Sequence, residues 1–100
     1  MILTEQETIA IRENIKARLS HGFHEVVFEK ADGSVRRMTC TRDIDLIEYE
    51  SLQGDKAERV EPVHYIRVFD TKVNDWRSFR FDKLISVDGL QTETLLALAR

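Results

Sequence analysis

The sequence contains a single cysteine, four scattered glycines and no long apolar run. The single cysteine, Cys40, excludes an intramolecular disulfide and favours a reducing compartment. Four scattered glycines exclude the glycine-rich phosphate loops of the common nucleotide-binding folds. No stretch approaches the roughly 20 apolar residues that a membrane-spanning helix needs. We therefore expect no membrane partner.

An excess of basic residues and a signal-peptide pattern are also missing. The net charge is −3 and the pI is about 5.6, which argues against a general DNA-binding protein while leaving room for a local basic patch. The first ten residues lack a basic segment followed by an apolar core, so we expect a cytoplasmic protein. Charged residues of both signs, 33% of the chain, are interspersed and predict the solvated surface of one globular domain over residues 1–100.

Residues 1–22 predict an N-terminal helix. Thr4 and Glu7 have the spacing of a capping box, in which each side chain satisfies an orphaned backbone donor. An apolar stripe follows at a spacing of four residues: Ile11, Ile15 and Leu19. Gly22 is a stop signal. Such a helix packs on the rest of the fold or contacts a second protein, and the pattern allows both.

Residues 23–88 predict a β core. Segments 23–29 and 35–41 have strand patterns, and Asp32-Gly33 between them predicts a hairpin turn. Segments 63–70, 76–82 and 83–87 predict further strands, whereas residues 42–61 form a long charged connection. Asp88 is the expected cap of a C-terminal helix over residues 89–100, whose apolar positions are Leu95, Leu96 and Leu98. The expected fold is mainly β (α+β), a small antiparallel barrel of about five strands with a helix at each end.

The two late strands have different faces when they are paired about the loop between residues 70 and 75. One face is apolar and is the natural core face: Ile66, Val68, Phe79 and Phe81. The other face is amphipathic: Tyr65, Arg67, Phe69, Trp76, Ser78 and Arg80. Aromatic rings stack on planar groups, and the arginine fork matches phosphate and carboxylate. This face suits a nucleotide, a single nucleic-acid strand or an acidic peptide, or it covers the barrel as part of its structure.

The same strands resemble the WYL domain, in particular the short WYL-like proteins of tailed bacteriophages. The segments concerned are HYIRVFD (residues 64–70) and NDWRSFRFDKLI (residues 74–85), and residues 26–40 are also similar. Tyr65 is the residue kept from the Trp-Tyr-Leu tripeptide, and Lys83 stands where an arginine is usual. The resemblance covers roughly residues 23–88. It implies an SH3-like or Sm-like barrel that binds a nucleotide or nucleic acid. By position, it also implies that four residues contact this ligand: Tyr65, Arg77, Arg80 and Lys83. Arg67 and Trp76 join these candidates from the face argument.

Signals of catalysis or metal binding are weak. His21, His24 and Cys40 lack the close spacing of a metal site, and Cys40 lies in an apolar strand pattern typical of a buried thiol. The paired carboxylates of the charged connection are typical of a solvated run: Asp43, Asp45, Glu48 and Glu50. We therefore expect no catalytic residue, no metal and no cofactor.

Two hypotheses follow. The first is a non-enzymatic, regulatory binding module, in the cytoplasm of an infected host if phage-encoded, that holds a nucleotide or short nucleic acid through aromatic stacking and arginine contacts. The second is a protein-interaction module whose terminal helices bind a host protein or a second copy of the chain. The residues expected at that second interface are Ile11, Ile15, Leu95 and Leu98.

Overall fold

Helix α1 (Glu5–Leu19) is the first element of the computed structural model, which describes residues 2–47 and 62–99. The predicted capping box is present, since Thr4 Oγ1 accepts a hydrogen bond from Glu7 N at 3.1 Å and Glu7 Oε1 accepts one from Thr4 N at 3.0 Å. The helix ends at Leu19, and Gly22 follows with a φ of +77°, a left-handed conformation that glycine adopts without strain. The chain can therefore turn directly from the helix into the first strand.

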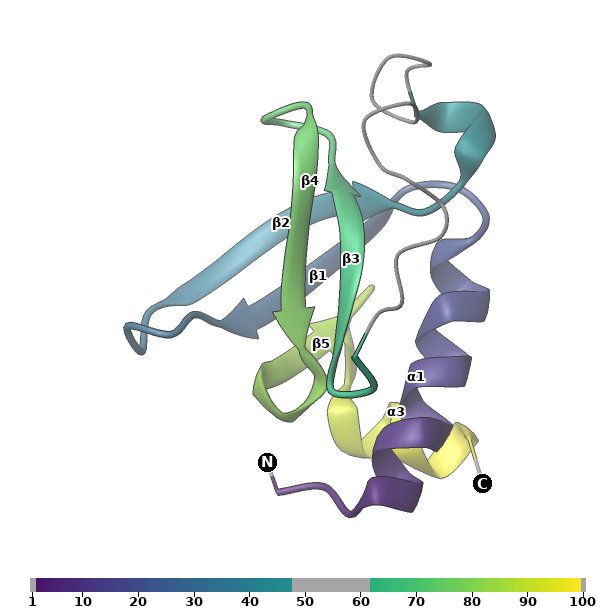
Figure 1. Ribbon diagram of the computed structural model, residues 1–100, viewed down its shortest axis with the longest axis vertical. Helices are drawn as coiled ribbons and strands as arrows, with labels where there is room; N and C mark the ends of the chain where they lie inside the picture. Colours follow the sequence, from purple (N-terminus) through teal and green to yellow (C-terminus); the bar gives the residue numbers. More distant parts are fainter. Residues whose placement is uncertain (1, 48–61, 100) are drawn as a thin grey trace.

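Six antiparallel strands follow and form one sheet in the order β4-β3-β2-β1-β5-β6 (Figure 1). Their bounds are β1 (His24–Glu29), β2 (Val35–Thr41), β3 (Tyr65–Asp70), β4 (Asp75–Arg80), β5 (Leu84–Val87) and β6 (Leu90–Gln91). Two short 3₁₀ turns, η1 (Ile44–Leu46) and η2 (Phe81–Lys83), and helix α3 (Thr92–Leu98) complete the described elements. The sheet contains one strand more than the five expected, the two-residue β6.

The register of both hairpins follows from the alternation of their side chains. In β1–β2, Val26 lies opposite Met38, and the turn contains Gly33 with a φ of +88°. In β3–β4, the predicted register is confirmed: Tyr65 lies opposite Arg80, and Phe69 lies opposite Trp76. The predicted core face of these strands is buried throughout: Ile66, Val68, Phe79 and Phe81.

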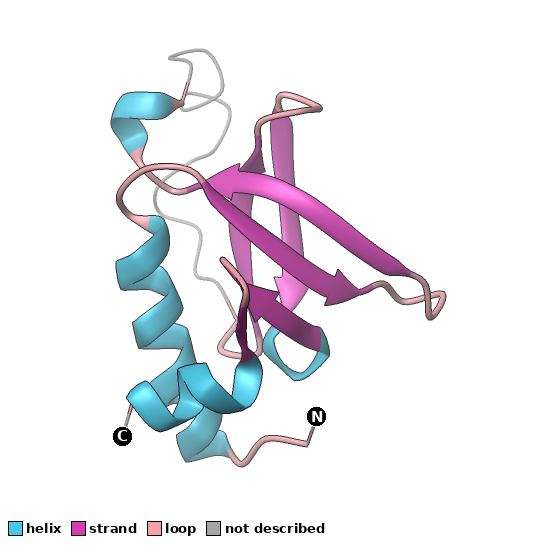
Figure 2. Ribbon diagram, turned by 180° about the vertical axis from the view of Figure 1, so that it is seen from behind, coloured by secondary structure: helices cyan, strands magenta, loops and turns pink. Residues whose placement is uncertain are grey.

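The sheet curls strongly, so that strands far apart in its order come into contact. β1 and β4 are separated by two strands, yet the rings of Phe28 and Phe79 stack with their centroids 5.5 Å apart. The β3–β4 hairpin crosses the long β1–β2 hairpin steeply, and Figure 2 shows the same crossing from behind. This curl is the barrel-like closure expected for a small antiparallel sheet.

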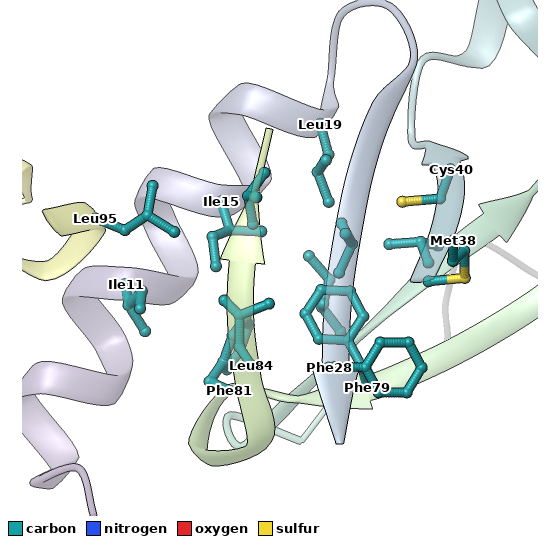
Figure 3. Packing of buried hydrophobic residues seen from close by; sticks show 14 of the residues in the cluster. Ile11, Ile15, Leu19, Phe28, Met38, Cys40, Phe79, Phe81, Leu84 and Leu95 are labelled. Carbon is teal, nitrogen blue, oxygen red and sulfur yellow. The ribbon is translucent and has the colours of Figure 1, made fainter. Parts of the chain in front are cut away.

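Helix α1 covers one side of the barrel. Ile11, Ile15 and Leu19 are each 0% exposed and point from the helix into the core, where they meet the strand side chains (Figure 3). Leu95 of α3 is also 0% exposed, whereas Leu98 is 58% exposed. Three of the four residues expected at an interface on the terminal helices therefore belong to the core of this chain, and Leu98 is the exposed one.

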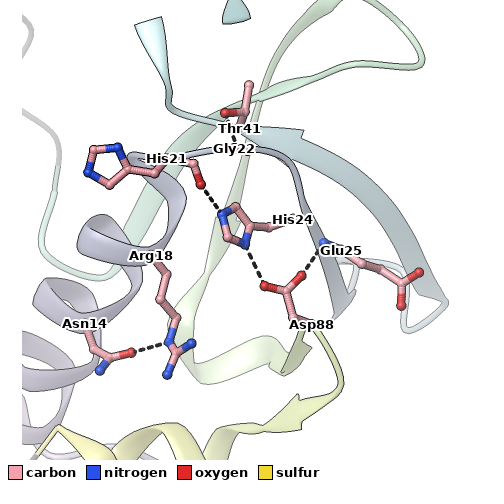
Figure 4. Close-up of polar contacts among 8 residues, drawn as sticks. All are labelled: Asn14, Arg18, His21, Gly22, His24, Glu25, Thr41 and Asp88. Carbon is pink, nitrogen blue, oxygen red and sulfur yellow. Dashed lines mark hydrogen bonds and ion pairs between the residues drawn. The ribbon is translucent and has the colours of Figure 1, made fainter. Parts of the chain in front are cut away.

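The turn between β5 and β6 corrects another prediction. Asp88 does not cap the C-terminal helix, which begins at Thr92. Its φ is +51°, and its carboxylate faces the start of β1, where Oδ1 accepts a hydrogen bond from Glu25 N at 2.9 Å and Oδ2 lies 2.6 Å from His24 Nδ1 (Figure 4). Asp88 therefore joins the last hairpin to the first strand.

The charged connection after β2 is described only in its first part. Asp43 is the N-cap residue of η1, and its carboxylate accepts hydrogen bonds from Asp45 N at 3.1 Å and Gly22 N at 3.0 Å. Its role in this structure is thus to cap a turn. Glu48 and Glu50, the other two carboxylates of that run, lie outside the described residues. No helix in the described part of the chain is long and apolar enough to cross a membrane.

Candidate functional site

Two adjoining hollows lie where β4 faces the end of the β1–β2 hairpin. The larger, of about 480 Å³, is lined by three aromatic residues, of which Phe28 and Phe79 are largely buried in the core, and is here named the aromatic hollow: Phe28, Tyr65 and Phe79. The smaller, of about 360 Å³, contains two arginines and a tryptophan and is named the arginine hollow: Arg36, Arg77 and Trp76. Both are also lined by Phe28, Lys30, Ala31 and Ser78. They therefore adjoin, and the two together are named the β4 groove.

The rim of the aromatic hollow carries more positive than negative charge. Arg80 donates two hydrogen bonds to the Asp82 carboxylate, at 3.0 and 3.2 Å, and this pairing lowers the pKa of Asp82 and raises the pKa of Arg80. Lys30, Lys83 and the acidic Glu29 also line the hollow, and neither lysine forms an ion pair with a carboxylate among residues 2–47 and 62–99. Two lysines are therefore available to an anionic ligand beside apolar rings.

The arginine hollow is organised by a buried carboxylate behind its wall. Asp70, at the end of β3, is 2% exposed. Its Oδ2 lies 3.3 Å from Arg77 Nε and 3.6 Å from Arg36 Nη2. Its Oδ1 accepts a hydrogen bond from Lys72 N at 3.0 Å. One carboxylate thus holds two guanidinium groups that come from different hairpins.

Five of the six predicted site residues line the β4 groove: Tyr65, Trp76, Arg77, Arg80 and Lys83. Arg67 does not, because its guanidinium lies over the Trp76 ring, 5.2 Å from the ring centroid. Phe69 is 3% exposed and packs edge-on against the same ring, with centroids 5.6 Å apart. The sequence left open whether this face binds a ligand or covers the barrel, and in the structure only part of the face lines the groove. Arg67 and Phe69 contact Trp76 from outside the groove.

The residues that the sequence argument missed belong to the first hairpin. Phe28 and Arg36 lie directly opposite each other in the β1–β2 ladder, and Lys30 extends the same face toward the turn. Their alternation with period two was visible in the sequence and placed them on one face. Nothing local indicated that this face meets β4, since the contact depends on the curl of the whole sheet.

Groups that resemble catalytic or metal-binding residues are engaged elsewhere. Burial raises the pKa of the Cys40 thiol to about 12, so the thiolate needed for nucleophilic attack is not formed at neutral pH. His24 contacts Asp88 and the carbonyl oxygen of His21. Within the described ranges, no three His, Cys, Asp or Glu side chains gather as a metal site would require.

Comparison with known proteins identifies the family. The WYL_2 family, described as an Sm-like SH3 β-barrel fold, matches residues 12–85, a range that extends from α1 into β5. The chain belongs to the WYL_2 family. The resemblance of the two late strands to WYL-like proteins, and the barrel that it implied, are thus confirmed.

A viral relative of this WYL_2 domain covers almost the whole chain. The chain is 46% identical over 99 residues to an uncharacterized 11.5 kDa protein in the Gp31-cd intergenic region of Enterobacteria phage T4, and the match spans 96% of this chain and 95% of that protein. No solved structure matches the chain.

Proposed function

We propose that the β4 groove binds a nucleotide or a short single-stranded nucleic acid. The observation that carries this proposal is the joining of an aromatic hollow to an arginine hollow in one groove. Their volumes, about 480 and 360 Å³, are of the size that holds small ligands. Bases stack on aromatic rings, and phosphates pair with arginine and lysine, so one groove offers both interactions that such a ligand uses.

Each predicted site residue has a role in this proposal. A base enters the aromatic hollow beside Tyr65, with Arg80 and Lys83 at the rim. Trp76 and Arg77 contact the adjoining part of the ligand in the arginine hollow. Arg67 acts indirectly, because its guanidinium packs on the Trp76 ring from outside the groove.

In this proposal the protein binds its ligand without changing it chemically. Its effect is then regulatory and depends on whether the groove is occupied. The buried Cys40 thiol and the paired His24 provide neither a nucleophile nor a base at the groove. We place this role in the cytoplasm of an infected cell.

The experiment is a thermal-shift screen against nucleotides, cyclic and linear dinucleotides and short single strands. A ligand present at 100 times its dissociation constant stabilises the folded state by about 2.7 kcal/mol, which raises the Tm of a domain of this size by roughly 10 °C or more. We expect such a shift for the unmodified protein and its loss in Arg80→Ala.

Arg37→Ala is the matched control for Arg80→Ala. Arg37 is an exposed arginine whose Nη1 lies 3.1 Å from Glu25 Oε1, so it resembles Arg80 in being paired with a carboxylate, but it lies outside the groove. The control should retain the full shift. No shift with any member of the screen, or equal losses in the two variants, would show that the groove is not the binding site.

A further inference from the structure

The arginine hollow contains more positive charge than the fold itself balances. Lys30, Arg36 and Arg77 line it, and no carboxylate lines it within the described residues. The nearby Asp70 carboxylate lies behind the wall and is shared by both arginines. Three cations therefore face one buried anion, and the excess charge is directed at the hollow.

The guanidinium groups of Arg36 and Arg77 lie close to Asp70, but their N–H donors are not all used in hydrogen bonds. Arg77 Nε is buried and lies 3.3 Å from Asp70 Oδ2, but it makes no well-aligned hydrogen bond. The contact of Arg36 Nη2 with the same oxygen is 3.6 Å, longer than a hydrogen bond. The Arg36 and Arg77 side chains are 28% and 38% exposed. Asp70 thus fixes the two side chains electrostatically and leaves N–H donors for a ligand.

The arrangement of the donors matches a phosphate group. Arg36 comes from β2 and Arg77 from β4, so their donors reach the hollow from different strands. Lys30 and Ser78 line the same space. A planar carboxylate is satisfied by one guanidinium fork, whereas the several oxygens of a phosphate accept from forks and single donors on different sides.

We propose that the arginine hollow is a phosphate subsite, formed by Arg36, Arg77 and Lys30 and held together by Asp70. The inference deepens the proposed function and rests on it for the identity of the whole ligand. It also gives the ligand a direction along the groove, with the base in the aromatic hollow and the phosphate beside Trp76. A nucleoside without phosphate should accordingly bind less tightly than its nucleotide.

Trp76 offers a direct readout, because it is the single tryptophan of the chain and lines the arginine hollow. Titration with inorganic pyrophosphate, against sodium chloride at matched ionic strength, should give a saturable change in tryptophan fluorescence. Arg36→Gln and Arg77→Gln should each weaken pyrophosphate binding about tenfold or more, as expected for the loss of one charge-assisted contact.

Arg37→Gln is the control, since it removes the same charge from the adjacent position on the opposite face of β2. It should bind pyrophosphate like the unmodified protein. Arg36→Lys preserves the charge but removes the fork, so it should bind at an intermediate level, and it replaces Arg36→Gln if that variant fails to fold. The subsite is disproved if the unmodified protein shows no saturable change, or if the control loses as much affinity as Arg36→Gln.

The subsite and the proposed function fail in different ways. If pyrophosphate binds but no nucleotide or single strand binds more tightly than pyrophosphate, the subsite stands and the nucleotide proposal fails. If nucleotides bind and neither Arg36→Gln nor Arg77→Gln affects them, the proposed function stands and the phosphate subsite fails. Tyr65→Ala, in the aromatic hollow, should weaken nucleotide binding and leave pyrophosphate binding unchanged.

Discussion

At the scale of single residues, His24 has an unusual set of neighbours. Its Nδ1 lies 2.6 Å from Asp88 Oδ2, and its Nε2 lies 2.6 Å from the carbonyl oxygen of His21 (Figure 4). A neutral imidazole has one N–H and can donate to only one of these oxygens, whereas the protonated ring donates to both. Partial burial and Arg18 act to lower the pKa of His24, but the hydrogen bonds and the charge of Asp88 outweigh them, so the pKa is raised.

A pH dependence of stability follows from this shift. The pKa of His24 is higher in the folded state than the ordinary value of 6.5, so its stabilising contribution is complete below 6.5 and is lost as the pH rises through the folded pKa. The free energy of unfolding, measured with urea, should therefore fall as the pH is raised above 6.5. His24→Gln should remove this component of the fall.

His21→Gln is the matched control, because it changes a neighbouring exposed histidine and keeps the backbone carbonyl that His24 contacts. Its pH profile should retain the fall seen in the unmodified protein. The explanation fails if His24→Gln and the unmodified protein have the same pH dependence.

Residue roles of this kind were hard to predict from the sequence. The sequence offers His24 only as a weak candidate for a metal ligand and Asp88 as a helix cap. Both interpretations rely on residues that are close to them in the sequence. Their actual contact joins residues 64 positions apart, and no local spacing indicates it. Thr4 and Glu7 were predicted correctly because a capping box depends on three residues of separation.

At the scale of elements, α1 owes its position to one stripe of side chains. Ile15 is 0% exposed, whereas Ile9 on the same helix is 44% exposed. Ile15→Ala should lower the free energy of unfolding by about 2–5 kcal/mol, the range for removing a buried isoleucine side chain. Ile9→Ala should change it by less than about 0.5 kcal/mol. Urea denaturation measures both, and equal losses would mean that the helix does not pack as described.

The strand pairings show which parts of this fold can be predicted from the sequence. The register of β3–β4 was predictable because side chains alternate with period two and the connecting loop is short. The contact between the first hairpin and β4 was not predictable, because Phe28 and Phe79 meet only when the sheet curls. Five of the twelve residues that line the β4 groove therefore come from the first hairpin, which the sequence analysis had not connected with β4.

At the scale of the whole molecule, the rate at which Cys40 reacts with a thiol reagent reports how often the core opens. Its side chain is 0% exposed, and burial raises its pKa to about 12. The thiol should therefore react with iodoacetamide at pH 8 only during unfolding, many times more slowly than in the protein denatured with urea. Labelling followed by mass spectrometry gives the rate, and native-state labelling at the rate of a free thiol would contradict the burial of Cys40.

The place of β1 in the sheet has a consequence for synthesis. β1 pairs with β2, its neighbour in sequence, and also with β5, where Val26 meets Val87. At roughly 5–20 residues per second, a ribosome needs several seconds to produce β5 after β1. The first hairpin therefore exists without its β5 partner until the last part of the chain has been made.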